Sequence, residues 1–222
     1  PDFPAKKTLP RKGMLLFFYA PYSLNWGSDP SYRDRWSVMY FDDPHANIAS
    51  RDYPEDLPEE YRYTPCSVKF KRQMTLPSLD SPLVEGLRLD DEMLDNYYDL
   101  ILAMDSIQGF DENASAHRIF GHPDQIRRNV YLDCLLGQNG FLESDKQMTD
   151  EEAAQLDREA GQFRLMLQVD SDENSGMKFG NYGTLFFVIS ADDLARKKFG
   201  KTWLVLQQAF KRDDDPSQDE TT

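Results

Sequence analysis

The sequence predicts a β-rich α+β fold with a central sheet and helices packed outside it. Two short apolar runs, residues 163–169 and 184–189, are rich in β-branched and aromatic residues and are bounded by turn residues. This composition favours two buried strands. Several other short apolar runs and several capped helical patterns occur along the chain. We therefore expect the two runs to form central strands of one sheet, with the rest of the chain around them.

Four other segments are predicted strands. Residues 14–20 are strongly apolar, and in residues 35–41 Trp36, Val38 and Tyr40 alternate with Ser37 and Met39, so we expect these two runs to pair as a hairpin with a long loop. Residues 66–74 alternate between apolar and basic or polar side chains, which predicts a half-exposed edge strand with a basic outer face. The last predicted strand covers residues 201–208, which read K-T-W-L-V-L-Q-Q.

The clearest predicted helix covers residues 91–108. Asp90 suits the N-cap position, and Gly109 suits the C-terminal end. An apolar stripe runs along this helix through Met93, Tyr97, Ile101 and Met104. Such a stripe can line a ligand groove, but packing against the core is its more common role, and we expect it here.

Three more helices are expected. Pro123 can open a helix over residues 124–136. Thr149 and Glu152 form a capping-box pattern at the start of residues 149–162. Ser190 suits the cap of a short helix over residues 190–199. The polar, proline-rich residues 42–65 predict a surface excursion with one helical turn near Glu59.

The chain of 222 residues shows neither an internal repeat nor a convincing linker. We expect one domain over residues 1–210, followed by a disordered acidic tail at residues 211–222. The sequence begins at Pro1 without Met, so we expect it to lack an N-terminal part of the domain. Cys66 and Cys134 have no metal-type spacing, which favours a reduced, cytoplasmic protein. No apolar run approaches 18 residues, so we expect no membrane span.

The net charge is −14, from 39 acidic and 25 basic residues. Such a chain is repelled by phosphate backbones and anionic membranes, so we expect neither nucleic-acid nor membrane binding. The charge favours association with a basic protein partner, although solubility alone also explains it.

Motifs for catalysis are absent from the sequence. We find no G-x-S-x-G, no phosphate-binding glycine loop and no cysteine in a catalytic context, so we name no catalytic residue and no cofactor. His117 and His122 are five residues apart, which does not suit two ligands on one helix face. Histidines of this kind more often orient a loop by hydrogen bonding.

The connection between the two central strands resembles a calcium loop in part. Asp170, Asp172 and Asn174 occupy positions 1, 3 and 5 of an EF-hand pattern, but Ser175 stands where glycine is needed and Asn181 where a bidentate Glu is needed. A polar turn between strands is the simpler interpretation. A weak Ca²⁺ or Mg²⁺ site completed by distant residues is the alternative.

Several uncommon motifs occur in a fixed order in the second half of the chain. They read H-R-I-F-G-H-P-D-Q-I, Y-L-D-C, G-Q-N-G, F-R-L-M-L-Q-V-D-S-D, G-M-K-F-G-N-Y-G-T-L-F-F-V-I, D-D-L and W-L-V-L-Q. Over residues 117–208 the chain resembles the bacterial YwqG-like family, a domain of unknown function. Phe179 and Asn181 replace the Trp and Asp that the family usually has in a W-G-D-x-G pattern, which removes a carboxylate from that place.

The resemblance implies a β roll with external helices and no established catalytic activity. Related domains near bacterial toxin genes suggest an immunity role. We therefore expect a non-catalytic acidic protein that neutralises a basic toxin domain through the excursion at residues 42–60 and the turn at residues 170–174. The candidate binding residues are Asp42, Asp43, Asp52, Glu55, Asp56, Asp170, Asp172 and Glu173. The alternatives are an interaction scaffold and a metal-dependent enzyme or small-ligand binder that uses His117, Asp170 and Asp172.

Overall fold

The computed structural model describes residues 9–21, 27–43, 52–109, 115–142 and 148–208. These residues form a two-stranded sheet, β1-β2, and a four-stranded antiparallel sheet of order β3-β4-β5-β6. The strands are β1 Met14–Tyr19, β2 Trp36–Phe41, β3 Arg118–Ile119, β4 Phe163–Asp170, β5 Thr184–Ser190 and β6 Trp203–Gln207. The α-helices are α2 Pro82–Glu85, α3 Asp91–Gln108, α4 Val130–Gln138, α5 Asp150–Ala160 and α6 Ala191–Ala195, and the 3-10 helices are η1 Pro30–Arg35, η2 Glu59–Tyr61 and η3 Phe199–Lys201.

The β-rich α+β prediction is confirmed, and β4 and β5 are the central strands of the larger sheet. The two strands pair along their whole length, with one irregularity between Leu165 and Leu167. Residues 184–189 of β5 are all buried. Full burial of a large apolar side chain stabilises the folded state by about 1.5–3 kcal/mol. The short apolar runs therefore form strands here because each can be covered on both faces.

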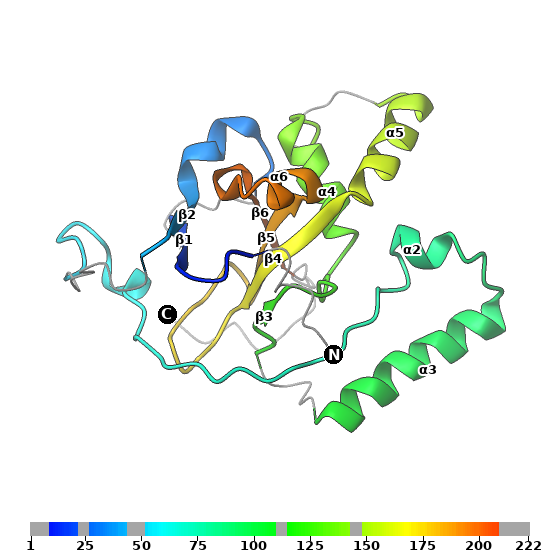
Figure 1. Cartoon of the computed structure of the whole chain (residues 1–222), viewed down its shortest axis with the longest axis horizontal. Coiled ribbons are helices and arrows are strands. Elements are labelled where there is room, and N and C mark those ends of the chain that lie inside the picture. The colour runs from blue at the N-terminus through cyan, green and yellow to red at the C-terminus, as the bar shows by residue number, and fades with distance from the viewer. Residues whose placement is uncertain (1–8, 22–26, 44–51, 110–114, 143–147, 209–222) are drawn as a thin grey trace, which may run out of the picture.

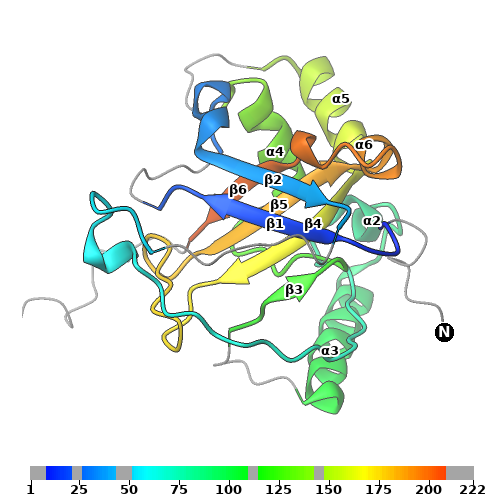
Figure 2. The ribbon, with the colours of Figure 1, turned by 60° about the vertical axis from the view of Figure 1, so that its left-hand side comes forward.

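The two faces of the larger sheet have different covers. Figure 2 shows the β1-β2 pair lying across one face, where the Phe17 and Phe187 rings meet edge to face at 5.1 Å. The predicted hairpin of β1 and β2 is confirmed in its register, from Met14 opposite Phe41 to Tyr19 opposite Trp36. Helix α4 packs against β5 and β6, and its Val130 and Cys134 are fully buried.

Several helix predictions are confirmed at their N-terminal ends, although the helix predicted over residues 190–199 ends earlier, at Ala195. Asp90 accepts the Met93 N–H at the start of α3. Thr149 and Glu152 form both halves of the capping box of α5, and Ser190 accepts the Asp193 N–H at the start of α6. These caps use hydrogen-bonding groups within three residues of each other, so the sequence predicts them without knowledge of the fold.

The predicted strand at residues 66–74 is wrong. The segment crosses the surface without a paired strand, and Val68, Phe70 and Met74 are 68%, 81% and 66% exposed. It is held to the end of α3, where the Met74 N–H donates to Gln108 Oε1 and Gln108 Nε2 donates to the Met74 carbonyl. Alternation alone does not make a strand, because a strand also needs a neighbour for its backbone groups.

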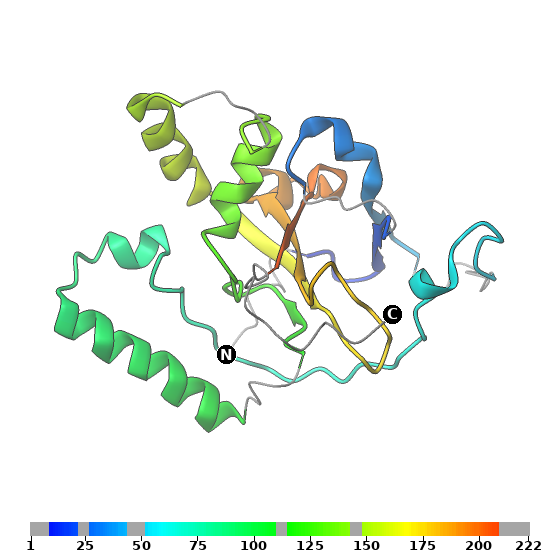
Figure 3. The ribbon, with the colours of Figure 1, turned by 180° about the vertical axis from the view of Figure 1, so that it is seen from behind.

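The expectation that the apolar stripe of α3 packs on the core is also wrong. None of the residues of α3 is buried, and Met93 is 53% exposed. Figures 1 and 3 show α2 and α3 standing to one side of the sheets. We call residues 66–109 the outer arm. Its buried anchor is Val84 in α2, which is 2% exposed.

The helix predicted from residue 124 begins later, at Val130, with Asn129 as its cap. Residues 124–128 lie along the end of the sheet, because two buried glutamines described below bind their backbone.

The two-residue strand β3 was not predicted and pairs with Gln168 and Leu167 of β4. The helical turn expected near Glu59 is confirmed as η2, and the tail predicted at residues 211–222 lies outside the described residues.

Candidate functional site

The two acidic segments named from the sequence meet in the structure. The Thr64 N–H donates to the Ser175 carbonyl at 2.8 Å, which joins residues 52–64 to the turn between β4 and β5. The Cys66 thiol lies 3.7 Å from the Asn174 carbonyl beside it. The Tyr53 hydroxyl binds the Tyr63 carbonyl, so the start of the segment is folded back on its end. Figure 1 shows the η2 segment next to this turn.

Residues 52–61 carry five carboxylates and no basic side chain. Glu55 and Asp56 are exposed, and Arg62 turns back to the carbonyls of Glu55 and Leu57, so it binds the backbone of the segment. The segment is thus closed on itself by backbone acceptors, while its carboxylates face solvent. Asp42 and Asp43 follow β2 and are exposed, but residues 44–51 between them and Asp52 lie outside the described residues.

We define the acidic surface as the exposed residues Asp52, Glu55, Asp56, Glu59, Glu60 and Glu173, together with Asp172, whose side chain is only 13% exposed. Asp170 does not belong to it, although the sequence analysis named it as a binding residue. Its Oδ2 accepts the Ala116 N–H and its Oδ1 accepts the Thr184 hydroxyl at 2.8 Å. The Asp170 carboxylate is therefore used inside the fold, where it fixes the end of β4.

Asp172 is held in an ionised form by its neighbours. Burial of this carboxyl raises its pKa, but hydrogen bonds from Asn174 and Ser175 and the nearby His117 lower the pKa by more, so the pKa lies below its usual value. The Asn174 N–H and side-chain amide both donate to Asp172 Oδ1, at 3.1 and 3.0 Å. These bonds make the turn rigid and keep its charge.

The structure brings together the three residues named for a metal-dependent or ligand-binding alternative. The Asp170 N–H donates to His117 Nδ1 at 3.2 Å, and His117 Nε2 lies 3.9 Å from Asp172 Oδ2. The histidine thus braces the chain before β3 against the turn after β4. In the ranges that the structure describes, no group of three or more His, Cys, Asp or Glu side chains is arranged to hold a metal ion.

Sequence analysis missed a row of polar residues on the α4 face of the sheet. Gln168 and Gln207 are fully buried on β4 and β6. Gln168 exchanges hydrogen bonds with Asp124 and donates to the Ala116 carbonyl. Gln207 accepts the Ile126 N–H and donates to the Arg128 carbonyl. The two glutamine side chains bind backbone groups of the loop before α4, which has no neighbouring strand to bind them. A glutamine in or at the end of an apolar run was the sequence signal for this arrangement.

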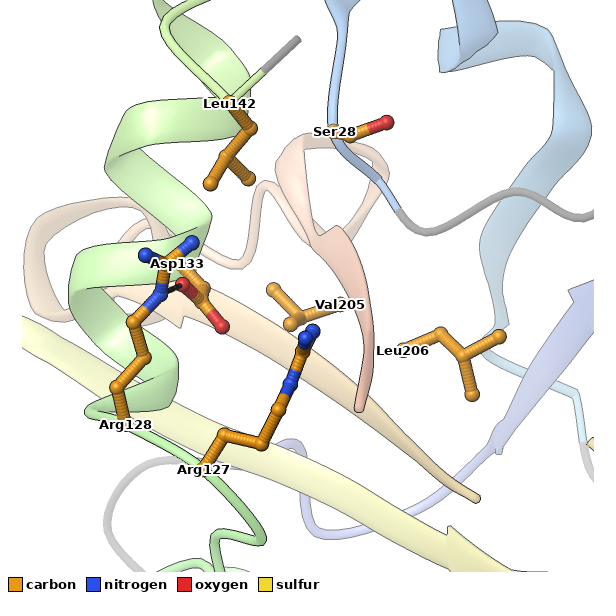
Figure 4. A pocket seen from close by; sticks show the side chains of 7 residues that line it. All are labelled: Ser28, Arg127, Arg128, Asp133, Leu142, Val205 and Leu206. Atoms are coloured by element: carbon orange, nitrogen blue, oxygen red, sulfur yellow. Dashed lines mark hydrogen bonds and ion pairs between the residues drawn. The ribbon is translucent and has the colours of Figure 1, made fainter. Parts of the chain in front are cut away.

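A pocket lies at the edge of β6, on the side of the sheet away from β3 (Figure 4). It has a volume of about 210 Å³. The lining residues are Ser28, Arg127, Arg128, Asp133, Leu142, Val205 and Leu206. Asp133 is 3% exposed and binds Arg128 Nε through Oδ1 and Gln207 Nε2 through Oδ2. This arrangement was not predicted, because its parts are distant in the sequence.

The two cysteines are free thiols. Cys134 is fully buried, and burial, together with the charge of Asp133, raises the pKa of its thiol well above the usual value. A thiol of that kind is a poor nucleophile at neutral pH. Cys66 is exposed beside the acidic surface.

Comparison with known proteins places this chain in a family whose function is not established. Among the helices that the structure describes, none has the length and apolar character needed to cross a membrane. No curated protein matches the chain. The model of a domain of unknown function, DUF1963, matches residues 1–207. The chain belongs to the DUF1963 family.

Proposed function

We propose that this protein is a non-catalytic binding protein that neutralises a basic protein partner through the acidic surface. The observation that carries the proposal is the hydrogen bond between Thr64 and Ser175, which joins two acidic segments that are about a hundred residues apart in the chain. The net charge of −14 also attracts a basic protein at long range. Rigid carboxylates facing solvent suit rapid, salt-sensitive association with lysine and arginine side chains.

The resemblance to YwqG-like proteins supports a bacterial immunity role, with a secreted or polymorphic toxin as the partner. Basic side chains that bind substrate would be the part of the toxin that the acidic surface covers. The free thiols Cys66 and Cys134 suit a reducing compartment, so we place the encounter in the cytoplasm.

The proposal is tested with the products of the genes that neighbour the gene for this chain. We expect the two proteins to co-purify and co-expression to protect the host cell. The Glu55→Lys/Asp56→Lys variant should slow association about tenfold at low ionic strength, because it reverses two charges on the acidic surface. Neither side chain makes a described contact within the fold, so the variant should keep its stability.

The matched control is Glu151→Lys/Asp157→Lys, which makes the same change of net charge on the exposed face of α5. It should slow association much less, because its charges lie away from the acidic surface. Equal effects of the two variants would mean that net charge, and not this surface, directs binding. If no complex forms and co-expression gives no protection, the immunity proposal is wrong.

A further inference from the structure

We infer that α3 binds a second copy of this chain, so that two α3 helices pair in antiparallel orientation around a two-fold axis. The contact lies in the outer arm, so it is separate from the acidic surface and does not depend on the proposed function. Among the described residues, more than half of the large apolar side chains that are exposed belong to the outer arm. Apolar side chains that gather in one region of a surface commonly mark a protein interface.

The exposed apolar residues of α3 follow a heptad pattern. Met93, Leu100 and Ile107 are seven residues apart, so they form one stripe along the helix, and they are 53%, 48% and 85% exposed. Tyr97 and Met104 lie between them, which completes the alternating spacing of four and three residues that is typical of paired helices. The 18 residues of α3 make a helix about 27 Å long. The stripe therefore offers a seam along nearly the whole helix.

The outer arm itself covers only one side of α3. The Tyr97 hydroxyl donates to the Pro77 carbonyl at 2.8 Å, and Gln108 binds both backbone groups of Met74 at the end of the helix. Figures 1 and 3 show no described element beyond the far side of α3. The stripe that contains Leu100 borders the covered side and is open to solvent, so a second helix can lie along it.

The carboxylates of α3 lie away from this seam. If Met93, Leu100 and Ile107 occupy position d of the heptad, all five carboxylates occupy positions b, c and f, which face outward; they are Asp91, Glu92, Asp95, Asp99 and Asp105. The flanking positions e and g hold only uncharged residues, namely Leu94, Asn96, Ile101, Ala103 and Gln108. Charges at e and g select the partner of a paired helix. Because this seam has none, two copies can meet without burying a carboxylate.

The two ends of α3 differ in charge, and this difference selects the antiparallel orientation. Asp91 and Glu92 lie in the first turn of the helix. At the other end, Lys71 Nζ binds the Gln108 carbonyl, which holds residues 69–72 and their three exposed basic side chains beside the C-terminus. An antiparallel pair places the basic end of each copy beside the acidic end of the other, whereas a parallel pair places like charges together. The two contacts are then identical, as a two-fold dimer requires.

The oligomeric state of the whole chain, measured by sedimentation over a range of concentrations, tests the inference. We expect a reversible equilibrium between monomer and dimer. Leu100 lies at the middle of α3, so Leu100→Glu places two carboxylates near the axis and should raise the dissociation constant of the dimer at least about tenfold. Leu102→Glu is the matched control, because Leu102 is equally exposed but lies on the opposite side of the helix. It should dimerise as the unaltered protein does.

Disulfide formation under mild oxidation tests the orientation. All variants carry Cys66→Ser, which removes the exposed native thiol. Leu100→Cys should cross-link with itself, whereas Leu102→Cys should not. Met93→Cys and Ile107→Cys should form a mixed disulfide with each other, because each lies seven residues from Leu100 on opposite sides of the axis. Neither should cross-link efficiently with itself.

Sedimentation as a monomer at every concentration up to about 1 mM would overturn the inference. Urea denaturation checks that the Glu variants are folded. An unchanged dissociation constant in Leu100→Glu, or an equal loss in Leu102→Glu, would show that the seam is not the interface. Self-cross-linking of Met93→Cys without the mixed disulfide would show a parallel pair, which contradicts the antiparallel arrangement.

Discussion

The larger sheet and the outer arm show two different ways in which this chain specifies structure. The sheet is stable because its strands are covered, and every residue of β6 is buried. Helix α3 in the outer arm has 18 residues, yet none of them is buried. Its ends are nevertheless well defined, with Asp90 as the N-cap and Gly109 in the left-handed conformation at the C-cap. Local signals therefore define this helix, whereas tertiary packing defines the sheet.

This difference predicts unequal responses to truncation of apolar side chains. Phe186→Ala should lower the free energy of unfolding by about 3–5 kcal/mol, because Phe186 is fully buried in β5. Leu102→Ala in α3 should change it by less than about 0.5 kcal/mol, because Leu102 is 50% exposed. Urea denaturation of the two variants measures both values. A large loss in Leu102→Ala would show that α3 is covered in solution.

The junction of the two regions should respond to pH. The His122 N–H donates to Thr75 Oγ1, which ties the outer arm to the loop before α4. Burial, and then the charges of Arg118 and Arg164, lower the pKa of His122 below 6.5. As the pH falls below 6.5, the unfolded chain therefore binds more protons than the folded chain does. The free energy of unfolding then decreases, so the folded state becomes less stable. The slope from this group is at most about 1.4 kcal/mol per pH unit.

The His122→Gln variant should lose this part of the pH dependence between pH 6.5 and 5. Urea denaturation at several pH values measures it as the difference in slope between the two proteins. The His117→Gln variant provides a comparison, because His117 is exposed and binds the turn after β4 instead of the outer arm. Parallel curves for His122→Gln and the unaltered protein would contradict the prediction.

The smallest expected effect is confined to the outer arm. Asp90→Ala removes the acceptor of the Met93 N–H and should destabilise the first turn of α3 by about 1 kcal/mol. Because α3 is not packed on the core, hydrogen exchange should accelerate at the start of α3, while the global free energy of unfolding stays nearly constant. Asp90→Ser keeps a capping oxygen and should exchange like the unaltered protein. A fall in global stability in Asp90→Ala would mean that α3 unfolds together with the sheet.

The candidate site could be predicted only in its parts. Sequence analysis named Glu55, Asp56, Asp172 and Glu173 because they lie in polar turns, and it placed His117 in a loop-orienting role. It could not predict that Thr64 and Ser175 join the two acidic segments, because that bond connects residues far apart in the chain. It also counted Asp170 among the binding residues, since a carboxylate that is used internally looks the same in sequence as one that faces solvent.

The sequence by itself determined the elements that depend on close neighbours. These are the central runs that became β4 and β5, the hairpin of β1 and β2, and the caps formed by Asp90, Thr149 and Ser190. The capping hydrogen bonds join residues three positions apart, and the apolar character of each strand is visible within its own run, so a local pattern contains this information.

Only the tertiary structure decided which groups form hydrogen bonds with the backbone outside the regular elements. Residues 66–74 have the alternation of a strand but pair with no strand that the structure describes. Helix α4 starts at Val130 because Gln168 and Gln207 bind the loop before it. A backbone group is satisfied by whatever lies next to it in space, and two distant segments become neighbours only when the chain folds. The acidic surface and the pocket at β6 arise in the same way.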